Sequence, residues 1–414
     1  MKDTLFVRFL GGFATCASLL LIGCQSDDSS SNGGGDTDSN DTDNSAGNNA
    51  DCEMGEMFSP IVLGDDDGDG SGNDLIRFIE YDEETGDIFF TSMDSFFRIP
   101  AGSDSFEEIP TDGLFTNSGQ FWLRDDNVYF PPGFGSTLLT DALTILHVMP
   151  ITGGTLTPHL KLSPNADFAY PNLAVRWVKI VGDNVFWSGR LDTEETDDNG
   201  ATISRELVFV TPFSETEVTA TNTVELYSTD LDYSIEGMYP VGGSLFLSVA
   251  ENELVYEDAN RFCSQVDPAG GGVIDSDVKA SRGGCIVGGD ETSMILSRNN
   301  MLAALEGGEP IEIYMARVSA DFSQSTVIME NTIMLPDMDS RNELWAWSDY
   351  FAEDVSAEID YVTIQNPGEA PTIIGCVDVS NGADVHAVSI GPDAVYLSYN
   401  NADDRNTILR YPLP

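Results

Sequence analysis

Positive charge is scarce in this sequence. Lysine and arginine total 18 residues against 70 aspartates and glutamates, a formal net charge of −52 over 414 residues. Lysine occurs at only four positions, Lys2, Lys161, Lys179 and Lys279. Nucleic acids are recognised through clusters of cationic side chains. A chain this acidic is therefore not expected to bind DNA or RNA.

The sequence also lacks an apolar run that is long enough to cross a bilayer. Its most apolar early stretch, residues 9–23, is interrupted by glycine and is too short for a hydrocarbon core of about 30 Å. Lys2 and Arg8 precede this stretch, and Leu21-Ile22-Gly23-Cys24 ends it. The arrangement is typical of a cleaved signal segment.

The residues at the end of that stretch resemble the lipobox of bacterial lipoproteins. In that class the cysteine after the small residue is diacylated and becomes the new N terminus, which implies a signal peptide at 1–23 and lipidation of Cys24. Each acyl CH₂ placed in lipid contributes about 0.8 kcal/mol, so two or three chains hold a folded domain at the membrane. The resemblance implies the bacterial outer membrane or cell surface. An ordinary secretory signal, with no special role for Cys24, is the alternative.

Large apolar residues are absent from the segment that follows the lipobox. Residues 24–50 consist almost wholly of Ser, Asn, Asp, Gly and Thr. Such a segment cannot bury enough surface to offset the entropy of ordering it. We therefore expect a disordered linker at 24–50 and a folded domain at 51–414.

Cysteine is rare in the folded part. Two of the six cysteines lie in the signal segment, which leaves Cys52, Cys263, Cys285 and Cys376. An even number of cysteines in an exported domain predicts two disulfides, and three pairings are possible. The local pairing of Cys263 with Cys285 would leave Cys52 for Cys376. The sequence contains no Cys-x-x-Cys pair and no Cys/His spacing of a zinc site, which argues against zinc.

Helical patterns are rare after residue 51, and one β pattern recurs instead. A turn of Gly, Asp or Asn precedes an apolar and aromatic strand in most copies, and a second apolar strand that often ends at a proline or glycine follows it. The copies lie 40 to 60 residues apart, and their third residues are Ile88, Val128, Val185, Leu245, Met294, Leu344 and Val395.

A period of about forty to sixty residues with about four strands in each repeat is typical of a β-propeller. The fold class predicted is all-β, a seven-bladed propeller. A β-sandwich is the alternative, but it does not supply one continuous period over a domain of this size. The last repeat ends after its third strand, so the apolar run Phe58–Leu63 is expected to supply the fourth strand and close the ring.

The repeats are loosely similar to those of secreted TolB-like and YWTD-like propellers, although no repeat carries the Tyr-Trp-Thr-Asp tetrapeptide. The nearest segments are Val185-Phe186-Trp187-Ser188 and Trp345-Ala346-Trp347-Ser348-Asp349. The similarity concerns the fold and implies no activity.

One acidic loop has the pattern of a calcium site. Asp65, Asp67 and Asp69 alternate before a glycine, as in the first half of a calcium loop, and Asn73 or Asp74 would complete the ligand set. The twelfth position, where an EF-hand has glutamate, is isoleucine. Calcium is thus the one cofactor suggested, and a solvated Asp-Gly loop is the preferred alternative.

Ligand-binding candidates follow the aromatic strands. Arg190, Arg298, Tyr350 and Tyr399 lie there, and arginines in so acidic a chain are suited to receive a carboxylate or sulfate, or else to form structural ion pairs. No catalytic residues can be assigned, because the three histidines are scattered and 70 carboxylates single out no pair. His147 and His386 are expected to pack as partly buried residues within strands.

These observations favour a lipid-anchored binding or scaffold module of the cell envelope, with an unknown protein or glycan ligand. A propeller enzyme acting on extracellular polysaccharide is the alternative. An enzyme would be distinguished by a cleft in which a carboxylate or histidine titrates abnormally among convergent polar groups.

The charge count generates a prediction about salt. If counterions screen the repulsion within a chain of net charge −52, the melting temperature of the mature domain rises between about 0.01 and 1 M NaCl, where the Debye length falls from about 30 to 3 Å. Such a response is expected of a protein from saline surroundings. A melting temperature that does not change with salt, measured by circular dichroism, would instead identify the charge as a solubility device.

Overall fold

The computed structural model describes residues 54–59, 61–62, 76–92, 95–112, 120–132, 143–163, 167–170, 173–196, 202–231, 233–251, 261–275, 284–289, 292–299, 313–319, 321, 323–330, 337–341, 344–349, 359–379, 385, 387–400 and 405–414. Every regular element within these ranges is a β-strand. The expected signal peptide, Cys24 and linker lie outside them. The described residues include no helix that is long and apolar enough to cross a membrane.

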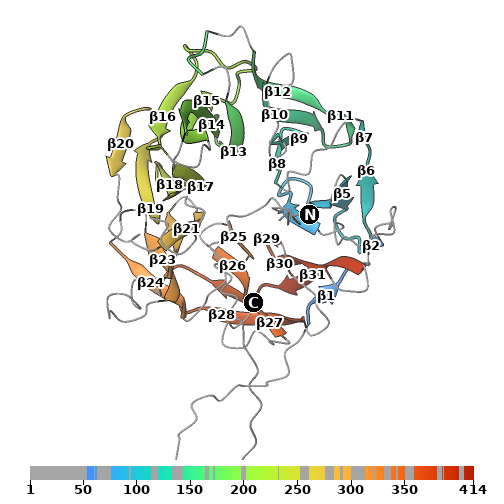
Figure 1. Ribbon diagram of the computed structural model, residues 1–414. Helices are drawn as coiled ribbons and strands as arrows, with labels where there is room; N and C mark the ends of the chain where they lie inside the picture. Colours follow the sequence, from blue (N-terminus) through green and yellow to red (C-terminus); the bar gives the residue numbers. More distant parts are fainter. Residues whose placement is uncertain are drawn as a thin grey trace, which may run out of the picture.

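The described strands form seven antiparallel sheets that follow one another around a ring, as the repeats predict (Figure 1). In the first six blades the chain runs from the innermost strand to the outermost. Blade one contains β3 (Ile76–Tyr81), β4 (Ile88–Ser92), β5 (Ser95–Ile99) and β6 (Glu107–Ile109). Blade two contains β8 (Trp122–Arg124), β9 (Asn127–Phe130), β10 (Leu143–Pro150) and β12 (Thr157–Leu162).

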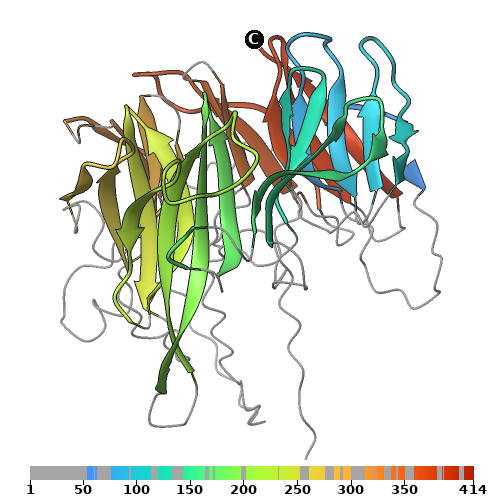
Figure 2. The ribbon, with the colours of Figure 1, turned by 90° about the horizontal axis from the view of Figure 1, so that it is seen from above.

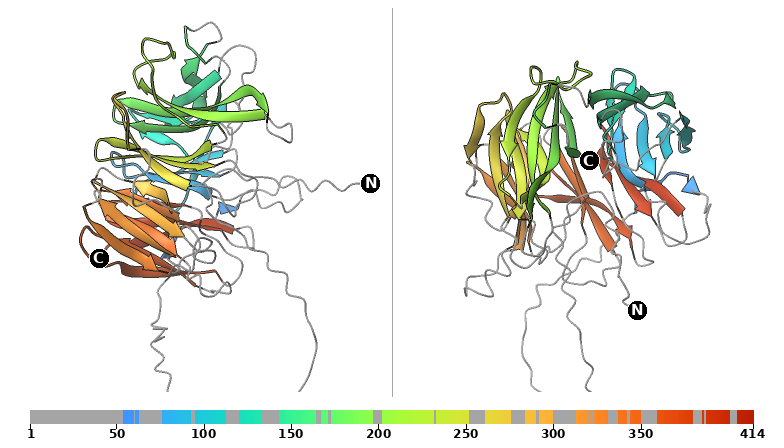
Figure 3. Two further views of the ribbon diagram at one scale, coloured as in Figure 1. Left: turned by 60° about the vertical axis from the view of Figure 1, so that its left-hand side comes forward. Right: turned by 45° about the horizontal axis from the view of Figure 1, so that its top comes forward.

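Blades three to six repeat this plan, and Figure 3 shows them from two further sides. Blade three contains β13 (Ala174–Val181), β14 (Asn184–Thr196), β15 (Thr202–Pro212) and β16 (Val224–Ser228). Blade four contains β17 (Tyr233–Val241), β18 (Ser244–Glu251), β19 (Arg261–Asp267) and β20 (Gly272–Asp275). Blade five contains β21 (Gly284–Gly289), β22 (Ser293–Asn299), β23 (Ile313–Ser319) and β24 (Ser325–Glu330). Blade six contains β25 (Asp337–Arg341), β26 (Leu344–Asp349), β27 (Ile359–Gln365) and β28 (Thr372–Asp378).

Blade seven combines both ends of the folded domain. Its three inner strands are β29 (Val388–Ile390), β30 (Ala394–Asn400) and β31 (Arg405–Pro412). Its outer strand consists of two short pieces, β1 (Glu56–Met57) and β2 (Ile61–Val62), which both pair antiparallel with β31. The predicted closing run Phe58–Leu63 is thus confirmed, with the correction that pairing begins at residue 56 and is interrupted. Proline 60, which has no N–H to donate, stands between the two pieces in the sequence.

Two smaller contacts join neighbouring blades near the perimeter. The parallel pair β7 (Thr111–Asp112) and β11 (Gly154–Thr155) connects the segments that follow blade one and the third strand of blade two. A parallel bridge between Lys161 and Glu217 connects blades two and three. These contacts add hydrogen bonds between sheets that otherwise meet through side chains.

The predicted aromatic strands are the second strand of every blade, and they carry the core. All five residues of β4 and all seven of β30 are buried. A strand with blades on both sides is buried on both faces, and this explains why apolar and aromatic residues occupy both faces of it. Aromatic pairs cross to the third strand, with ring centroids 5.0 Å apart for Phe90 and Phe97 and 4.4 Å apart for Trp187 and Phe209.

Three cysteines of the folded domain lie on described strands, one each in blades four, five and six. Cys376 is on β28, the outer strand of blade six. Met54, two residues after Cys52, forms a parallel bridge with Cys376. Cys52 itself is outside the described residues, so its pairing with Cys376 stays a prediction. Cys263 on β19 packs in a buried cluster with Met294 and Leu296 of blade five and forms no disulfide, so the predicted pairing with Cys285 is not found in the structure.

A disulfide between Cys52 and Cys376 would fasten the closing strand to blade six. Cys52→Ser is expected to lower the free energy of unfolding of the oxidised mature domain by roughly 2–4 kcal/mol, because the cross-link restricts the unfolded chain. Urea denaturation measures the change, and reductant should have a smaller effect on the variant than on the parent. Alkylation of Cys52 in unreduced protein from the native host would contradict the pairing.

Candidate binding site

The two faces of the ring differ in the length of their connections. The turns between first and second strands are tight in most blades, for example residues 182–183 and 242–243. The second strands end and the third strands begin at the opposite face, where longer stretches of sequence separate them, as between Glu251 and Arg261 and between Asn299 and Ile313. In Figure 2 the β14–β15 hairpin projects on this face, opposite the C terminus. The 213–223 connection is a long exception on the tight-turn face.

The innermost strands share an irregularity close to the long-connection face. Pairing with the second strand shifts register at the same position in three blades, after Ile76, Val175 and Ile235. In blade five the shift follows Ile286, two residues closer to the turn. Such β-bulges bend a strand and redirect its side chains. In blade three the buried Ser188 supports the bulge, because its Oγ accepts a hydrogen bond from the Trp177 N–H at 3.3 Å.

Side chains of one blade form hydrogen bonds with the innermost strand of the next blade. The bonded groups are the backbone N–H and carbonyl of the residue that precedes the bulge. The Ile235 N–H donates to Oε2 of Glu206 in blade three at 2.6 Å, and the Ile235 carbonyl accepts from the Trp177 indole N–H at 2.7 Å. The Ile76 N–H likewise donates to Oδ1 of Asn400 in blade seven at 3.2 Å. These bonds satisfy backbone groups that no neighbouring strand pairs.

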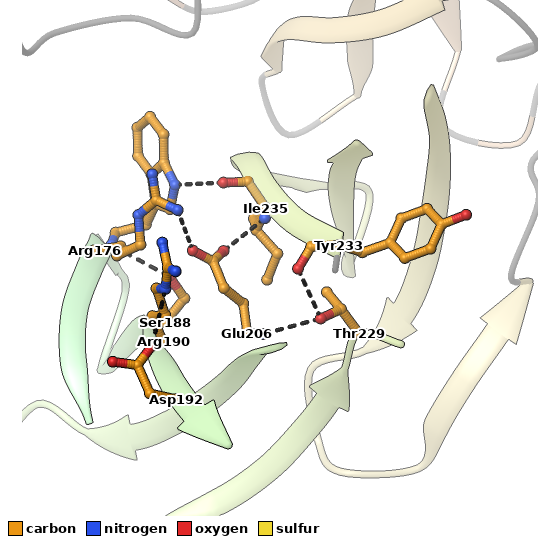
Figure 4. A network of polar contacts seen from close by, with 9 residues as sticks. Arg176, Ser188, Arg190, Asp192, Glu206, Thr229, Tyr233 and Ile235 are labelled. Atoms are coloured by element: carbon orange, nitrogen blue, oxygen red, sulfur yellow. Dashed lines mark hydrogen bonds and ion pairs between the residues drawn. The ribbon is translucent and has the colours of Figure 1, made fainter. Parts of the chain in front are cut away.

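Glu206 is the centre of the polar junction between blades three and four (Figure 4). Its residue is only 1% exposed, and its Oε1 accepts a hydrogen bond from Arg176 Nη1 at 2.6 Å. Its backbone N–H donates to the Thr229 hydroxyl, which in turn donates to the Tyr233 carbonyl. Burial raises the pKa of Glu206, and the opposing effects of Arg176 and the Ile235 N–H are smaller.

The raised pKa does not make Glu206 suited to act as a catalytic acid. A protonatable carboxyl group in a cleft is a frequent sign of catalysis. Here each carboxylate oxygen is bonded by this chain's own groups, and the side chain is buried. Glu206 therefore joins two blades and fixes Arg176.

Arg190 lies beside the same carboxylate. In the sheet Arg190 stands directly opposite Glu206 on one side and Ala174 on the other. Its Nε donates to Asp192 Oδ1 at 3.3 Å, and its charge opposes the rise in the pKa of Glu206. The side chains of Arg176 and Arg190 are 29% and 43% exposed. Two guanidinium groups are thus accessible at one junction.

Of the other predicted ligand-binding residues, Tyr399 has a described side chain, and it lies away from this junction. Tyr399 is buried in the core, and its hydroxyl donates to the Asp378 carbonyl at 3.2 Å. Arg298 lies on β22, but its side chain is outside the described residues, and so is Tyr350.

The proposed calcium ligands Asp65, Asp67, Asp69, Asn73 and Asp74 also lie outside the described residues. Among the residues that are described, no group of three or more His, Cys, Asp or Glu side chains is placed to hold a metal ion. His147 is partly buried as expected, and burial lowers its pKa. His159 lies within β12, and its Nε2 is 2.9 Å from the Phe213 carbonyl oxygen. His386 is not described.

Sequence reasoning missed Glu206, Arg176 and Trp177. A signal for Glu206 was present, because the strand period of two places it on the same face as Val208 and Val210. Both valines are buried against blade four. An acidic residue aligned with buried valines requires polar partners in the core, although the sequence does not show which ones.

No protein-family model matches the chain, and no curated protein matches it significantly. A puromycin-hydrolyzing peptidase of Mycobacterium tuberculosis is structurally similar, with 13% identity and a TM-score of 0.49 over 87% of this chain and 56% of that one. A Pyrococcus horikoshii acylaminoacyl peptidase gives 9% identity and 0.49 over 82% and 52%. The β-propeller domain of the Trilobed protease from Pyrococcus furiosus gives 8% identity and 0.46 over 87% and 94%.

These similarities concern the fold alone. The chain spans about half the length of the first two peptidases. At such low identity and TM-score, the peptidase activity of those proteins carries no argument about this one. The propeller architecture follows from the strand pairing described above.

The raised pKa of Glu206 predicts a pH effect on stability. The folded protein keeps this proton to a higher pH than the unfolded chain, so the associated stability is complete below the unfolded pKa and is lost as pH rises through the folded pKa. The free energy of unfolding of the parent minus that of Glu206→Gln is expected to fall as pH rises from about 4 toward neutrality, by about 1.4 kcal/mol per unit of pKa elevation.

Urea denaturation in high salt at several pH values measures this difference. Ser188→Ala is the matched control, because it disturbs the same junction without removing a titrating group. A difference for Glu206→Gln that grows with pH would show that Arg176 and the Ile235 N–H outweigh burial.

Proposed function

We propose that this protein is a binding module of the bacterial cell envelope, held by lipid on Cys24 and displayed on the 24–50 linker. Its ligand-binding surface is the long-connection face of the propeller. The observation that carries the proposal is the junction on this side of the ring, where Arg176 and Arg190 are accessible beside an inner strand. The lipobox and the polar linker support an exposed, tethered domain.

The structure also gives a reason to prefer binding over the polysaccharide-degrading alternative. Polysaccharide hydrolysis needs two carboxyl groups at a substrate, one of them protonated. Glu206, whose pKa burial raises, is engaged by Arg176 and Ile235 and has no exposed surface to offer a substrate. The polar groups of this junction are arranged to hold an arginine in place.

The test inserts one epitope-tag peptide at either of two places. One insertion is in the 252–260 connection on the long-connection face. The matched control is at the exposed turn residues Ala101 and Gly102 on the opposite face. The mature domain is labelled, and its binding to delipidated envelope material and to extracellular polymer from the host is measured.

Binding is expected to fall with the first insertion and to persist with the second. Equal loss from both insertions would contradict a ligand surface on one face. Release of reducing ends from the polymer would favour the enzyme. Circular dichroism of both proteins checks that the insertions leave the propeller folded.

A further inference from the structure

Arg176 and Arg190 form an accessible cationic pair at the inner wall of the ring. Arg176 lies on the innermost strand β13, and Arg190 lies on the adjacent strand β14. Both side chains are drawn beside the Glu206 carboxylate in Figure 4. Arginine presents a planar set of donors that matches a carboxylate. The pair therefore has the chemistry to receive one more carboxylate from solution.

The two arginines are held in different ways. Arg176 is fixed by its 2.6 Å bond to the buried Glu206, so little side-chain freedom remains to be lost on binding. Arg190 pairs at 3.3 Å with Asp192, whose side chain is 68% exposed. An exposed pair of this kind is weak, so an incoming carboxylate can replace Asp192 as the partner of Arg190.

The charge of the whole chain selects the rest of the ligand. A net charge of −52 attracts cations and repels polyanions at long range. An acidic polysaccharide would meet that repulsion along its full length. A ligand with a single carboxylate and an otherwise positive charge is attracted to the acidic protein at long range, and its carboxylate can bind the arginines at short range. A basic peptide with a free C terminus has this combination.

We propose that Arg176 and Arg190 bind the free C-terminal carboxylate of a positively charged peptide. This proposal rests on the binding function proposed above and names its ligand class. Arg190 contacts the carboxylate directly, and Arg176 presents the second guanidinium from the position that Glu206 fixes. The lysines or arginines of the peptide lie against the acidic surroundings.

Calorimetric titration of the mature protein in 0.15 M NaCl tests the proposal. The probes are the peptide Gly-Lys-Ala-Lys-Ala with a free C terminus, the same peptide amidated, an amidated version ending in Glu, and hexagalacturonate. The free acid is expected to bind at least tenfold more tightly than the amide. A side-chain carboxylate that substitutes fully for the C terminus would overturn the C-terminal assignment.

Three variants assign the effect to the site. Arg190→Gln and the double variant Arg176→Gln/Glu206→Gln should reduce the affinity for the acid to that for the amide. Asp192→Asn should increase the affinity for the acid, because it removes the competing carboxylate. Arg190 is exposed, so its variant is expected to fold even if the double variant does not.

Arg124→Gln is the matched control. Arg124 is also on an innermost strand, is 30% exposed and pairs with Asp183 at 2.8 Å, but it lies at the tight-turn face. The proposal would be overturned if Arg124→Gln weakened binding as much as Arg190→Gln does, or if the acid and the amide bound equally well. It would also be overturned if hexagalacturonate bound more tightly than the free acid, or if neither peptide gave heat at 1 mM. The binding function itself would then be tested by the insertion experiment, which uses host material and changes neither Arg176 nor Arg190.

Discussion

The innermost strand of a blade has one backbone edge without a neighbouring strand, and the ring depends on how that edge is satisfied. An amide group that is buried without a partner costs about 1–3 kcal/mol. In blades one and four a side chain from the preceding blade provides the partner. Glu206 and Trp177 bond Ile235, Asn400 bonds Ile76, and Ser389 accepts from the Tyr81 N–H. The same bonds that satisfy the edge therefore also set the positions of adjacent blades.

The outermost edges are treated differently, and the seam shows how. β31 would be an open edge if β1 and β2 did not pair with it. The seam is tied to blade six as well, because the buried Tyr411 hydroxyl donates to the Cys376 carbonyl at 2.6 Å, and burial raises the pKa of Tyr411 to about 12. Closure thus joins the N-terminal segment, blade seven and blade six through backbone pairing and one buried hydroxyl.

The sequence was sufficient to predict the blades because burial of a strand on both faces determines which types of residue the strand contains. A strand such as Ala394–Asn400, which is buried throughout, is mostly apolar and aromatic on both faces, and the repetition of such strands every forty to sixty residues indicates the ring. The closing strand could be predicted because one repeat lacked a partner. The break between β1 and β2 could not, since it depends on register against β31.

The candidate site could be predicted only in part for a physical reason. Arg190 was identified because arginine is conspicuous in an acidic chain. Arg176 and Glu206 were not, because their pairing depends on which face of β15 meets blade four. The bulge after Val175, which brings Arg176 within reach, has no sequence signature comparable to a turn glycine. Side-chain partners across blades are properties of packing, and one sequence does not contain them explicitly.

A comparison of two junctions indicates why a charged pair is used beside Arg190. Asn400 bonds Ile76 with a neutral amide, so the edge bond alone does not require a carboxylate. Glu206 makes the same kind of bond to Ile235, and it is also buried. A buried carboxylate loses more hydration free energy than a buried amide does, and its ion pair must offset that larger cost. What the ion pair adds is an arginine held in place on the innermost strand. We infer that the fixed guanidinium, and not the blade contact, is the reason for glutamate at this position.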